Sequence, residues 1–367
     1  MENEANYNIA NNKFVRHSAL MSAYLSRDFE KFCQLIDEGH NIHCIDTFGM
    51  PLINSVIENI DNIKNNKDFF NKLLSSGVLS KNHSNKFDPL TFSIIRQDDI
   101  YYMKKILESG ANVNIIGKSI EDSDIFSYGP PIFETLCKFD ADKINLLLEY
   151  NPDLELCNAD GQPILSFLFD ICMHKDNFLC DFISILVKNG ASLEDSDNTG
   201  DRPIHYWAKR IGDVKVLDFF IKNNVDFNVR NYFGETPLLL CIRNNHMDAA
   251  IALIKNGANL NVQNSEGQTA FMLAANCHEL DLLNLMESKC DISKLDNDGE
   301  NFAHYLVRYL LRSNYDNVDG SAKILQKHRK FFSLKNHFGD SALDILKWGN
   351  AKKHSLFINF NEQENML

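Results

Sequence analysis

The chain has no apolar run long enough to cross a membrane. A spanning helix needs about 20 consecutive apolar residues, and the longest apolar stretches here, near Leu146–Leu148 and Leu238–Ile242, are far shorter. Met1 to Lys13 is polar and rich in asparagine. It lacks the basic start and apolar core of a secretory signal peptide. These features argue against an integral membrane protein and predict a cytosolic one.

Positive charge is also scarce. The 37 Lys and Arg residues stand against 50 Asp and Glu residues, and the net charge is −13. Nucleic-acid binding needs a positive surface that neutralises phosphates, so we predict no nucleic-acid partner. The nine cysteines are an odd number and include no Cys-x-x-Cys pair. We interpret them as small buried residues in a reducing compartment.

The motifs of common enzymes and cofactor sites are missing as well. The sequence has no phosphate-binding loop, no dinucleotide fingerprint, no Gly-x-Ser-x-Gly elbow and no kinase signature. The His and Cys spacings match no familiar zinc pattern. Cys277 and His278 are adjacent, but the pattern favours a buried cysteine and a histidine between helices. We therefore predict a non-enzymatic protein with no catalytic residue, cofactor or metal site.

What the sequence does contain is a recurring turn. Nine four-residue segments, most of the form Asn/Asp-x-x-Gly, end 32 to 41 residues apart. They begin at Asp46, Asn85, Phe126, Asn158, Asp197, Asn231, Asn264, Asp296 and Asn336. An Asn or Asp side chain bonds its own backbone and glycine supplies positive φ, so each segment predicts a chain reversal. A repeat of about 33 residues with occasional insertions explains the spacing.

Each turn is followed by the pattern of two short helices. In the clearest unit, Pro237 suits the first turn of a helix, and Leu238–Ile242 forms its apolar body. The second helix, Met247 to Lys255, has apolar residues three and four positions apart. Asn256-Gly257 ends it, because glycine adopts the left-handed conformation that closes a helix.

These phrases resemble the ankyrin repeat. Gly234-Glu-Thr-Pro-Leu238 through Leu253-Ile-Lys-Asn-Gly-Ala-Asn-Leu-Asn261 is close to the family pattern, and Ile106–Asn114 and Leu186–Leu193 repeat its closing phrase. Gly267–Ala270 repeats the opening phrase. The resemblance implies an all-α ankyrin-repeat solenoid of about nine helix-turn-helix units with β-hairpin-like turns. It is most specific between residues 185 and 300 and degenerate from 40 to 180.

A solenoid buries its apolar faces only against neighbouring units, so its ends need caps. We predict an N-terminal tail and capping helix over 1–37 and the repeat array over 38–339. A C-terminal cap follows over 340–358, with a flexible tail over 359–367.

Two departures from the ankyrin pattern concern the first helices. His205 and His304 alone keep the family's helix-starting histidine, which ties adjacent turns. Trp207 stands where the family has a small residue, and the step from Gly200 to Gly234 is one residue too long. We place the extra residue near Ile211 and expect Trp207 to bulge or repack.

The solenoid surface predicts a protein-binding site. Tyr206, Lys209 and Arg210 on one first helix, and Arg243 and Asn244 on the next, are expected to face the groove. Aromatic side chains also recur at turn tips, where solubility alone does not require them. They are Phe48, Phe87, Tyr128, Tyr232, Phe233 and Phe338. The predicted partner-binding residues are Tyr206, Lys209, Arg210, Tyr232, Phe233, Arg243 and Asn244.

The carboxyl end carries a second resemblance. Phe360–Leu367 has paired Glu residues beside apolar ones and is similar to the C-terminal signals of ankyrin effectors exported by type IV secretion in intracellular bacteria. This implies a protein secreted without a signal peptide into a host cytoplasm, where it binds a host protein. We also expect the protein to be a monomer. Two alternatives stay open: an effector enzyme with an unrecognised site in the irregular units 115–185 or after 300, and a housekeeping ankyrin scaffold.

Overall fold

The computed structural model describes residues 18–46, 49–59, 63, 65–80, 88–116, 129–172, 179–312, 324 and 327–348. Within these ranges the chain is helical and contains no β-strand. Two isolated antiparallel bridges join Ile45 to Pro51 and Lys335 to Ser341. The chain forms two compact units, Met1–Asp160 and Gly161–Leu367.

The first unit is a series of short helices. They are α1 (Ala19–Leu25), α2 (Phe29–Asp37), α3 (Leu52–Glu58), α4 (Asn66–Ser75), the 3-10 helix η1 (Val78–Ser80), α5 (Pro89–Arg96), α6 (Ile100–Glu108), α7 (Pro131–Cys137) and α8 (Ala141–Leu148). Within this unit α3, α5 and α7 stack on one another, and α4 packs on α2 as α8 packs on α6. The single capping helix expected in 1–37 is in fact two helices, α1 and α2.

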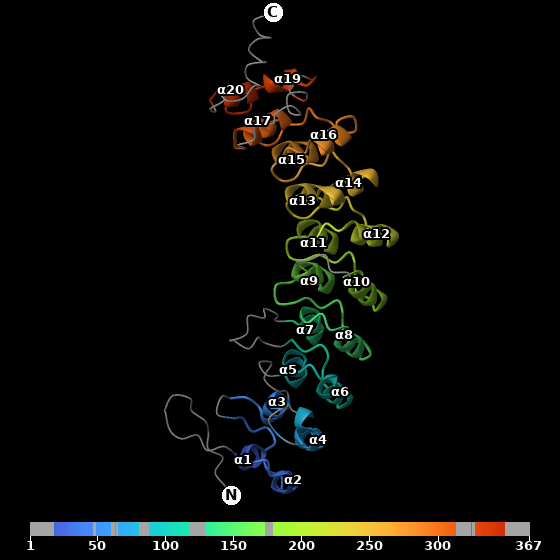
Figure 1. The fold of residues 1–367 in the computed structure, drawn as a ribbon, viewed down its shortest axis with the longest axis vertical. Coiled ribbons are helices and arrows are strands. Elements are labelled where there is room, and N and C mark those ends of the chain that lie inside the picture. The colour runs from blue at the N-terminus through green and yellow to red at the C-terminus, as the bar shows by residue number, and fades with distance from the viewer. Residues whose placement is uncertain are drawn as a thin grey trace, which may run out of the picture. The chain divides into compact units, whose positions relative to one another are not determined.

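The second unit repeats the same arrangement with more regularity. Its helices are α9 (Ile164–Ile171), α10 (Leu179–Lys188), α11 (Pro203–Arg210), α12 (Val214–Lys222), α13 (Pro237–Arg243), α14 (Met247–Lys255), α15 (Ala270–Cys277), α16 (Leu280–Met286), α17 (Phe302–Arg312), α19 (Arg329–Phe332) and α20 (Ala342–Trp348). The first helices α9, α11, α13, α15 and α17 form one row, and the second helices α10, α12, α14 and α16 form another (Figure 1).

Local sequence explains where these helices begin. Aspartate caps several second helices: Asp213 accepts a hydrogen bond from the N–H of Lys215 at 2.8 Å. Thr236 and Thr269 precede α13 and α15 and accept from backbone N–H groups inside each helix. Proline stands in the first turn of α11 and α13, where its missing N–H loses no helical bond. None of the described helices is long and apolar enough to cross a bilayer, and α17 has only 11 residues.

The stacked rows bury continuous apolar surface. In α13 every residue from Pro237 to Ile242 is buried, because the helix is covered by α11, α14 and α15. Near the carboxyl end, Phe302 of α17 contacts Phe271 of α15 with ring centroids 5.0 Å apart. Full burial of a side chain of this size contributes about 1.5–3 kcal/mol. The core is therefore a line of neighbour-to-neighbour contacts, as expected of stacked repeats.

Trp207 repacks and does not bulge. Helix α11 runs without interruption through it, the indole is fully buried, and its Nε1 donates to the Asp213 carbonyl at 3.0 Å. The ring lies edge-on to Phe220, with centroids 6.0 Å apart. The extra residue lies where we placed it: α11 and α12 start at 203 and 214, a step of 11, against a step of 10 between 237 and 247 in the next pair.

The predicted terminal regions are only partly described. Helix α20 and the bridge at Ser341 lie inside the predicted C-terminal cap, 340–358. Residues 1–17, 349–358 and the tail 359–367 lie outside the described residues, as do the tip residues Phe48, Phe87 and Tyr128. Most of each of the turns beginning at Asn85 and Phe126 also falls outside them, and only Asp88 and Gly129 of these two turns are described.

Candidate functional site: the face formed by turns and first helices

The five turns from Asp197 to Asp340 share one hydrogen-bond scheme. In the turn 231–235, the N–H of Asn231 donates to the Glu235 carbonyl at 3.1 Å, and the N–H of Gly234 donates back to Asn231 at 2.9 Å. The Asn231 Oδ1 accepts from the N–H groups of Phe233 and Glu235. The same pattern holds in the turns 197–201, 264–268, 296–300 and 336–340. The Asn/Asp and Gly of the repeat therefore act as the sequence predicts.

Adjacent turns are joined by one backbone bond each. In every case the backbone N–H of the second residue of a turn donates to the backbone carbonyl of the third residue of the preceding turn. The pairs are Tyr232 to Thr199, Ser265 to Phe233, Asn297 to Glu266 and His337 to Asp298, at 2.8–3.0 Å. We call this series the turn ladder. It fixes the spacing of the turns and therefore of the first helices that follow them.

Side chains reinforce the turn ladder in two ways. Where a turn begins with Asn, its Nδ2 donates to an acid at the end of the preceding turn. The pairs are Asn231 to Asp201 at 2.7 Å, Asn264 to Glu235 at 3.0 Å and Asn336 to Glu300 at 3.1 Å. An aspartate has no such donor. The turns that begin with Asp use a different arrangement.

In those turns a tyrosine supplies the missing proton. Tyr206 donates its hydroxyl to the Asp197 Oδ2 at 2.7 Å and accepts from Gln162 Nε2 at 3.1 Å. Tyr305 makes the same two bonds with Asp296 and Gln268. Burial opposes ionisation of Asp197, but hydrogen bonds from Tyr206, Thr199 and the backbone hold its pKa below the usual value. Burial and the bond to Asp197 raise the pKa of Tyr206, so the phenol stays protonated.

Three of the turn-ending acids also bind a base eight residues later on the first helix. Asp201 pairs with Lys209, Glu235 with Arg243 at 2.7 Å, and Glu300 with Arg308 at 2.5 Å. Asp201 and Glu300 are almost fully buried, so each acid is balanced by a base that reaches the surface. Arg210 pairs instead with Asp170 of α9 at 2.7 Å.

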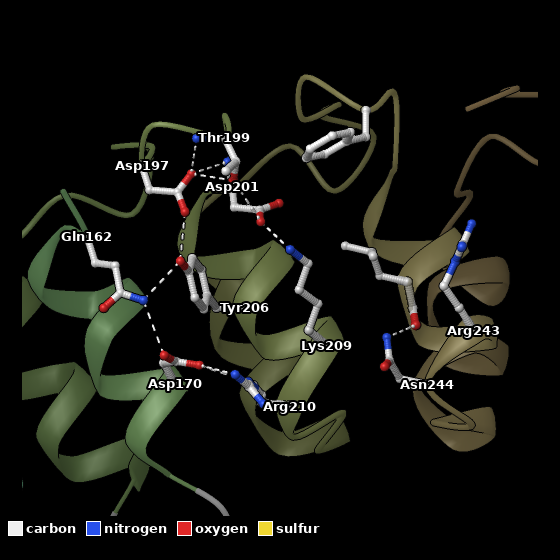
Figure 2. Close-up of a pocket in the computed structure, with 12 residues that line it drawn as sticks. Gln162, Asp170, Asp197, Thr199, Asp201, Tyr206, Lys209, Arg210, Arg243 and Asn244 are labelled. Atoms are coloured by element: carbon white, nitrogen blue, oxygen red, sulfur yellow. Dashed lines mark hydrogen bonds and ion pairs between the residues drawn. The ribbon is translucent and has the colours of Figure 1, made fainter. Parts of the chain in front are cut away.

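These side chains surround a pocket of about 530 Å³ on α9, α11 and α13 (Figure 2). The lining residues are Gln162, Asp170, Asp197, Thr199, Asp201, Tyr206, Lys209, Arg210, Phe233, Leu240, Arg243 and Asn244. In Figure 2 Lys209 and Arg210 extend from α11, while Arg243 and Asn244 lie on α13 across the opening. The pocket combines a network of paired charges with the apolar side chains of Phe233 and Leu240.

Six of the seven predicted partner-binding residues line this pocket: Tyr206, Lys209, Arg210, Phe233, Arg243 and Asn244. Tyr206 is buried, and its hydroxyl already makes two hydrogen bonds within the chain. Tyr232 lies outside the lining, at the turn tip, with 76% of its surface exposed, and Phe233 is 55% exposed. The assignment of these residues to a partner stays a prediction.

Sequence reasoning missed the acidic half of the pocket. Asp201 and Asp170 hold Lys209 and Arg210 in place, and Asp197 binds Tyr206. A readable signal existed: an acid at the fifth residue of a turn is followed by a base eight positions later in three units. The cross-unit partners Gln162 and Asp170 had no such signal, because their pairing depends on how the helices stack.

Of the two helix-starting histidines, His304 reaches the following turn, whereas the ring of His205 accepts a bond at the start of its own helix. His304 places Nε2 3.2 Å from the Asp340 carbonyl, as expected of a residue that ties adjacent turns. His205 accepts from the N–H of Arg202 through Nδ1 at 3.0 Å. Burial lowers the pKa of His205, while Asp201 and the backbone at Val229 and Glu235 act in the opposite direction.

Cysteine chemistry has no support in the described part of the chain. Burial raises the pKa of Cys137 to about 12 and that of Cys290 to about 11, so both are thiols at neutral pH. Burial also raises the pKa of Cys277, whose Sγ contacts the Ile242 carbonyl, and His278 stacks on Tyr309. The described residues include no group of three or more His, Cys, Asp or Glu that could hold a metal ion.

The family model for ankyrin repeats matches residues 204–298 in three copies. This range holds α12 to α16 and all of α11 except Pro203, and it contains most of the pocket lining. No curated protein matches the chain. Ankyrin repeats suggest a protein–protein interaction module.

Proposed function

We propose that this protein is a non-enzymatic binding module that takes a protein partner on the face formed by its turns and first helices. The predicted contact residues are Tyr206, Lys209, Arg210, Tyr232, Phe233, Arg243 and Asn244. The mechanism is occupancy: the partner is recruited or masked by contact alone. Ankyrin repeats at 204–298 support this class of function.

One observation carries the proposal: exposed aromatic residues border a pocket that is lined by internal hydrogen bonds and ion pairs. Phe233 lines the pocket while half of its surface remains exposed, and Tyr232 is exposed beside it. Both residues belong to a turn held by the turn ladder on two sides, through Thr199 and Ser265. Aromatic residues next to a pocket are common anchors at the centre of a protein interface.

The test compares two turn tips of the same kind. Phe338 occupies the same turn position as Phe233 and is 70% exposed, but does not line the pocket. Wild type, Tyr232→Ala/Phe233→Ala and Phe338→Ala are used as baits in cell lysate, with mass spectrometry as the readout. We expect a partner retained by wild type and Phe338→Ala and weakened several-fold or more by the double variant.

The purified partner is then titrated against all three proteins, with the thermal midpoint as a folding control. Partners lost equally from Phe338→Ala and the double variant would contradict a site at the pocket. Equal retention by all three proteins would remove Tyr232 and Phe233 from the interface.

The finer hypotheses extend this module beyond the matched repeats. We propose that the array has about nine units with β-hairpin-like turns and acts as a monomer. The helix pairs on both sides of 204–298 and the turn at 336–340 support the longer array. The effector hypothesis depends on Phe360–Leu367, which lie outside the described residues. A reporter-fusion translocation assay with and without 359–367 tests it, and equal translocation or none would contradict an export signal there.

A further inference from the structure

The acidic side chains of the pocket already hold donors from within the chain. Asp197 accepts from Thr199, the Asp201 N–H and Tyr206. Both carboxylate oxygens of Asp201 are bound, one by Asn231 and the other by Lys209 and Thr199. The carboxylates of Asp197 and Asp201 therefore already have hydrogen-bond donors from within the chain.

Asp170 completes this set. Its Oδ1 accepts from Arg210 Nε at 2.8 Å, and its Oδ2 accepts from Gln162 at 3.2 Å. Every carboxylate oxygen that lines the pocket thus has at least one donor. A basic group of a partner would have to displace one of these internal bonds in order to bind.

The two arginines of the pocket, Arg210 and Arg243, by contrast keep hydrogen-bond donors that are not used within the described residues. A guanidinium has five N–H donors. Arg243 uses one terminal nitrogen for Glu235 and Gln268, and Arg210 uses Nε and one terminal nitrogen for Asp170. Their other N–H groups have no hydrogen bond to the described residues. The side chains of Arg210 and Arg243 are 51% and 40% exposed, so these donors are accessible to a ligand.

From this imbalance we infer that the pocket binds the carboxylate of an acidic side chain, Asp or Glu, on the partner protein. This inference rests on the proposed function and adds the chemical group of the partner that the pocket recognises. Arg243 projects from α13 beside the pocket, whereas Arg210 of α11 points toward Asp170 of α9 (Figure 2). A carboxylate beside Arg243 accepts charge-assisted bonds from the N–H groups of Arg243 that Glu235 and Gln268 do not use. Phe233 and Leu240 then contact an apolar residue beside the acid, so the recognised segment has an apolar residue next to its acid.

The experiment uses short random peptides displayed against the full-length chain. Peptides retained by wild type but not by Phe233→Ala are sequenced, and we expect enrichment of Asp and Glu next to apolar residues. One selected peptide is then labelled with a fluorophore and titrated in a double-mutant cycle. The Glu→Gln form of the peptide is combined with Arg243→Met in the protein. This cycle isolates the interaction energy between the peptide carboxylate and Arg243.

For one charge-assisted bond we expect Glu→Gln to weaken binding to wild type about tenfold. The Arg243→Met protein should bind the Glu peptide more weakly than wild type does, and its affinity should change little when the peptide Glu is replaced by Gln. Arg308→Met is the matched control: Arg308 pairs with Glu300 as Arg243 pairs with Glu235, but it does not line the pocket. That variant should lose similar thermal stability and keep full peptide affinity.

The outcomes separate the two hypotheses. Selected peptides rich in Lys or Arg, or equal losses from Glu→Gln in wild type and Arg243→Met, would overturn the carboxylate inference and leave the binding module intact. If no peptide depends on Phe233, the proposed binding face itself is contradicted.

Discussion

At the scale of single residues, the choice between Asn and Asp at the start of a turn decides how it is held. Asn231 donates directly to the preceding acid, whereas Asp197 needs the hydroxyl of Tyr206. The position of these turns, and the roles of their first residue and glycine, could be predicted from spacing alone. The partner of each side chain could not, because Gln162 and Tyr206 are 44 residues apart.

Removal of the Tyr206 hydroxyl should destabilise the fold. In Tyr206→Phe the Asp197 Oδ2 loses its donor in a half-buried site, which costs about 1–3 kcal/mol. Tyr305→Phe should behave alike, because Tyr305 binds Asp296 and Gln268 in the same way. Urea denaturation measures the loss. Tyr309→Phe on the same helix is the control, with a change within about 0.5 kcal/mol. Equal values for all three variants would contradict the role assigned to the two hydroxyls.

His205 should make stability depend on pH. Its pKa is lowered in the folded protein by burial, so the folded state favours the neutral ring. An unfolded histidine titrates near about 6.5. The contribution is therefore fully present above that pH and is lost as pH falls from there toward the folded pKa.

The measurement is urea unfolding of wild type and His205→Gln across this range. We expect the difference in unfolding free energy between the two proteins to shrink as the pH falls below about 6.5. A difference that is constant with pH would show that the pKa of His205 is the same in the folded and unfolded states.

At the scale of elements, the regular units could be predicted almost to the residue. The expected second helix Met247 to Lys255 coincides with α14, because its apolar spacing and terminal Asn-Gly are both strong signals. The N-terminal cap is less clear in sequence: 1–37 holds two helices, separated at Arg27, which has φ of 63° without being glycine. Asp28, which caps α2, is the one signal of that break in the sequence, and it is a weak one without a glycine or proline beside it.

Glycines that look equivalent in sequence should differ in their tolerance of alanine. Gly200 has φ of 78°, and an added Cβ would lie 2.7 Å from the Tyr232 ring and 3.1 Å from its backbone nitrogen. Gly257 has φ of 89° with nothing within 4 Å. Gly257→Ala therefore carries only conformational strain, about 1 kcal/mol, and Gly200→Ala adds a clash with the turn ladder.

Thermal denaturation ranks the two variants, and we expect Gly200→Ala to have the lower midpoint by several degrees. Adding Tyr232→Ala to Gly200→Ala should recover part of the difference, since the ring contact is removed and the backbone contact remains. Equal midpoints for Gly200→Ala and Gly257→Ala would exclude the clash.

At the scale of the whole molecule, contacts run between neighbouring elements. Helix α13 packs on α11, α14 and α15, and α17 packs on α15, α19 and α20. The repeat period predicted this kind of core, because each unit has an apolar face that only a neighbour can cover. The period does not specify the pairing of charges across units, which depends on residues far apart in the chain.

A cavity in one unit should therefore weaken mainly its neighbours. Ile242 of α13 is fully buried, and Ile242→Ala should cost about 2–5 kcal/mol. Hydrogen exchange by mass spectrometry should show lost protection in α11, α13 and α15, with α1 to α8 nearly unchanged. Uniform loss across all of these helices would mean that the chain unfolds as one cooperative block.

The choice of Asn or Asp at the start of the five turns from 197 to 340 limits how such units can be recombined. Among these five turns, those led by Asn follow a turn that ends in Asp201, Glu235 or Glu300, whereas those led by Asp follow a turn that ends in Gln162 or Gln268. Shuffling that puts an Asp-led unit after an acid-ended one would set two carboxylates against each other with no proton between them. Duplication or grafting of units in this chain is therefore compatible with the fold only when the junction keeps donor facing acceptor.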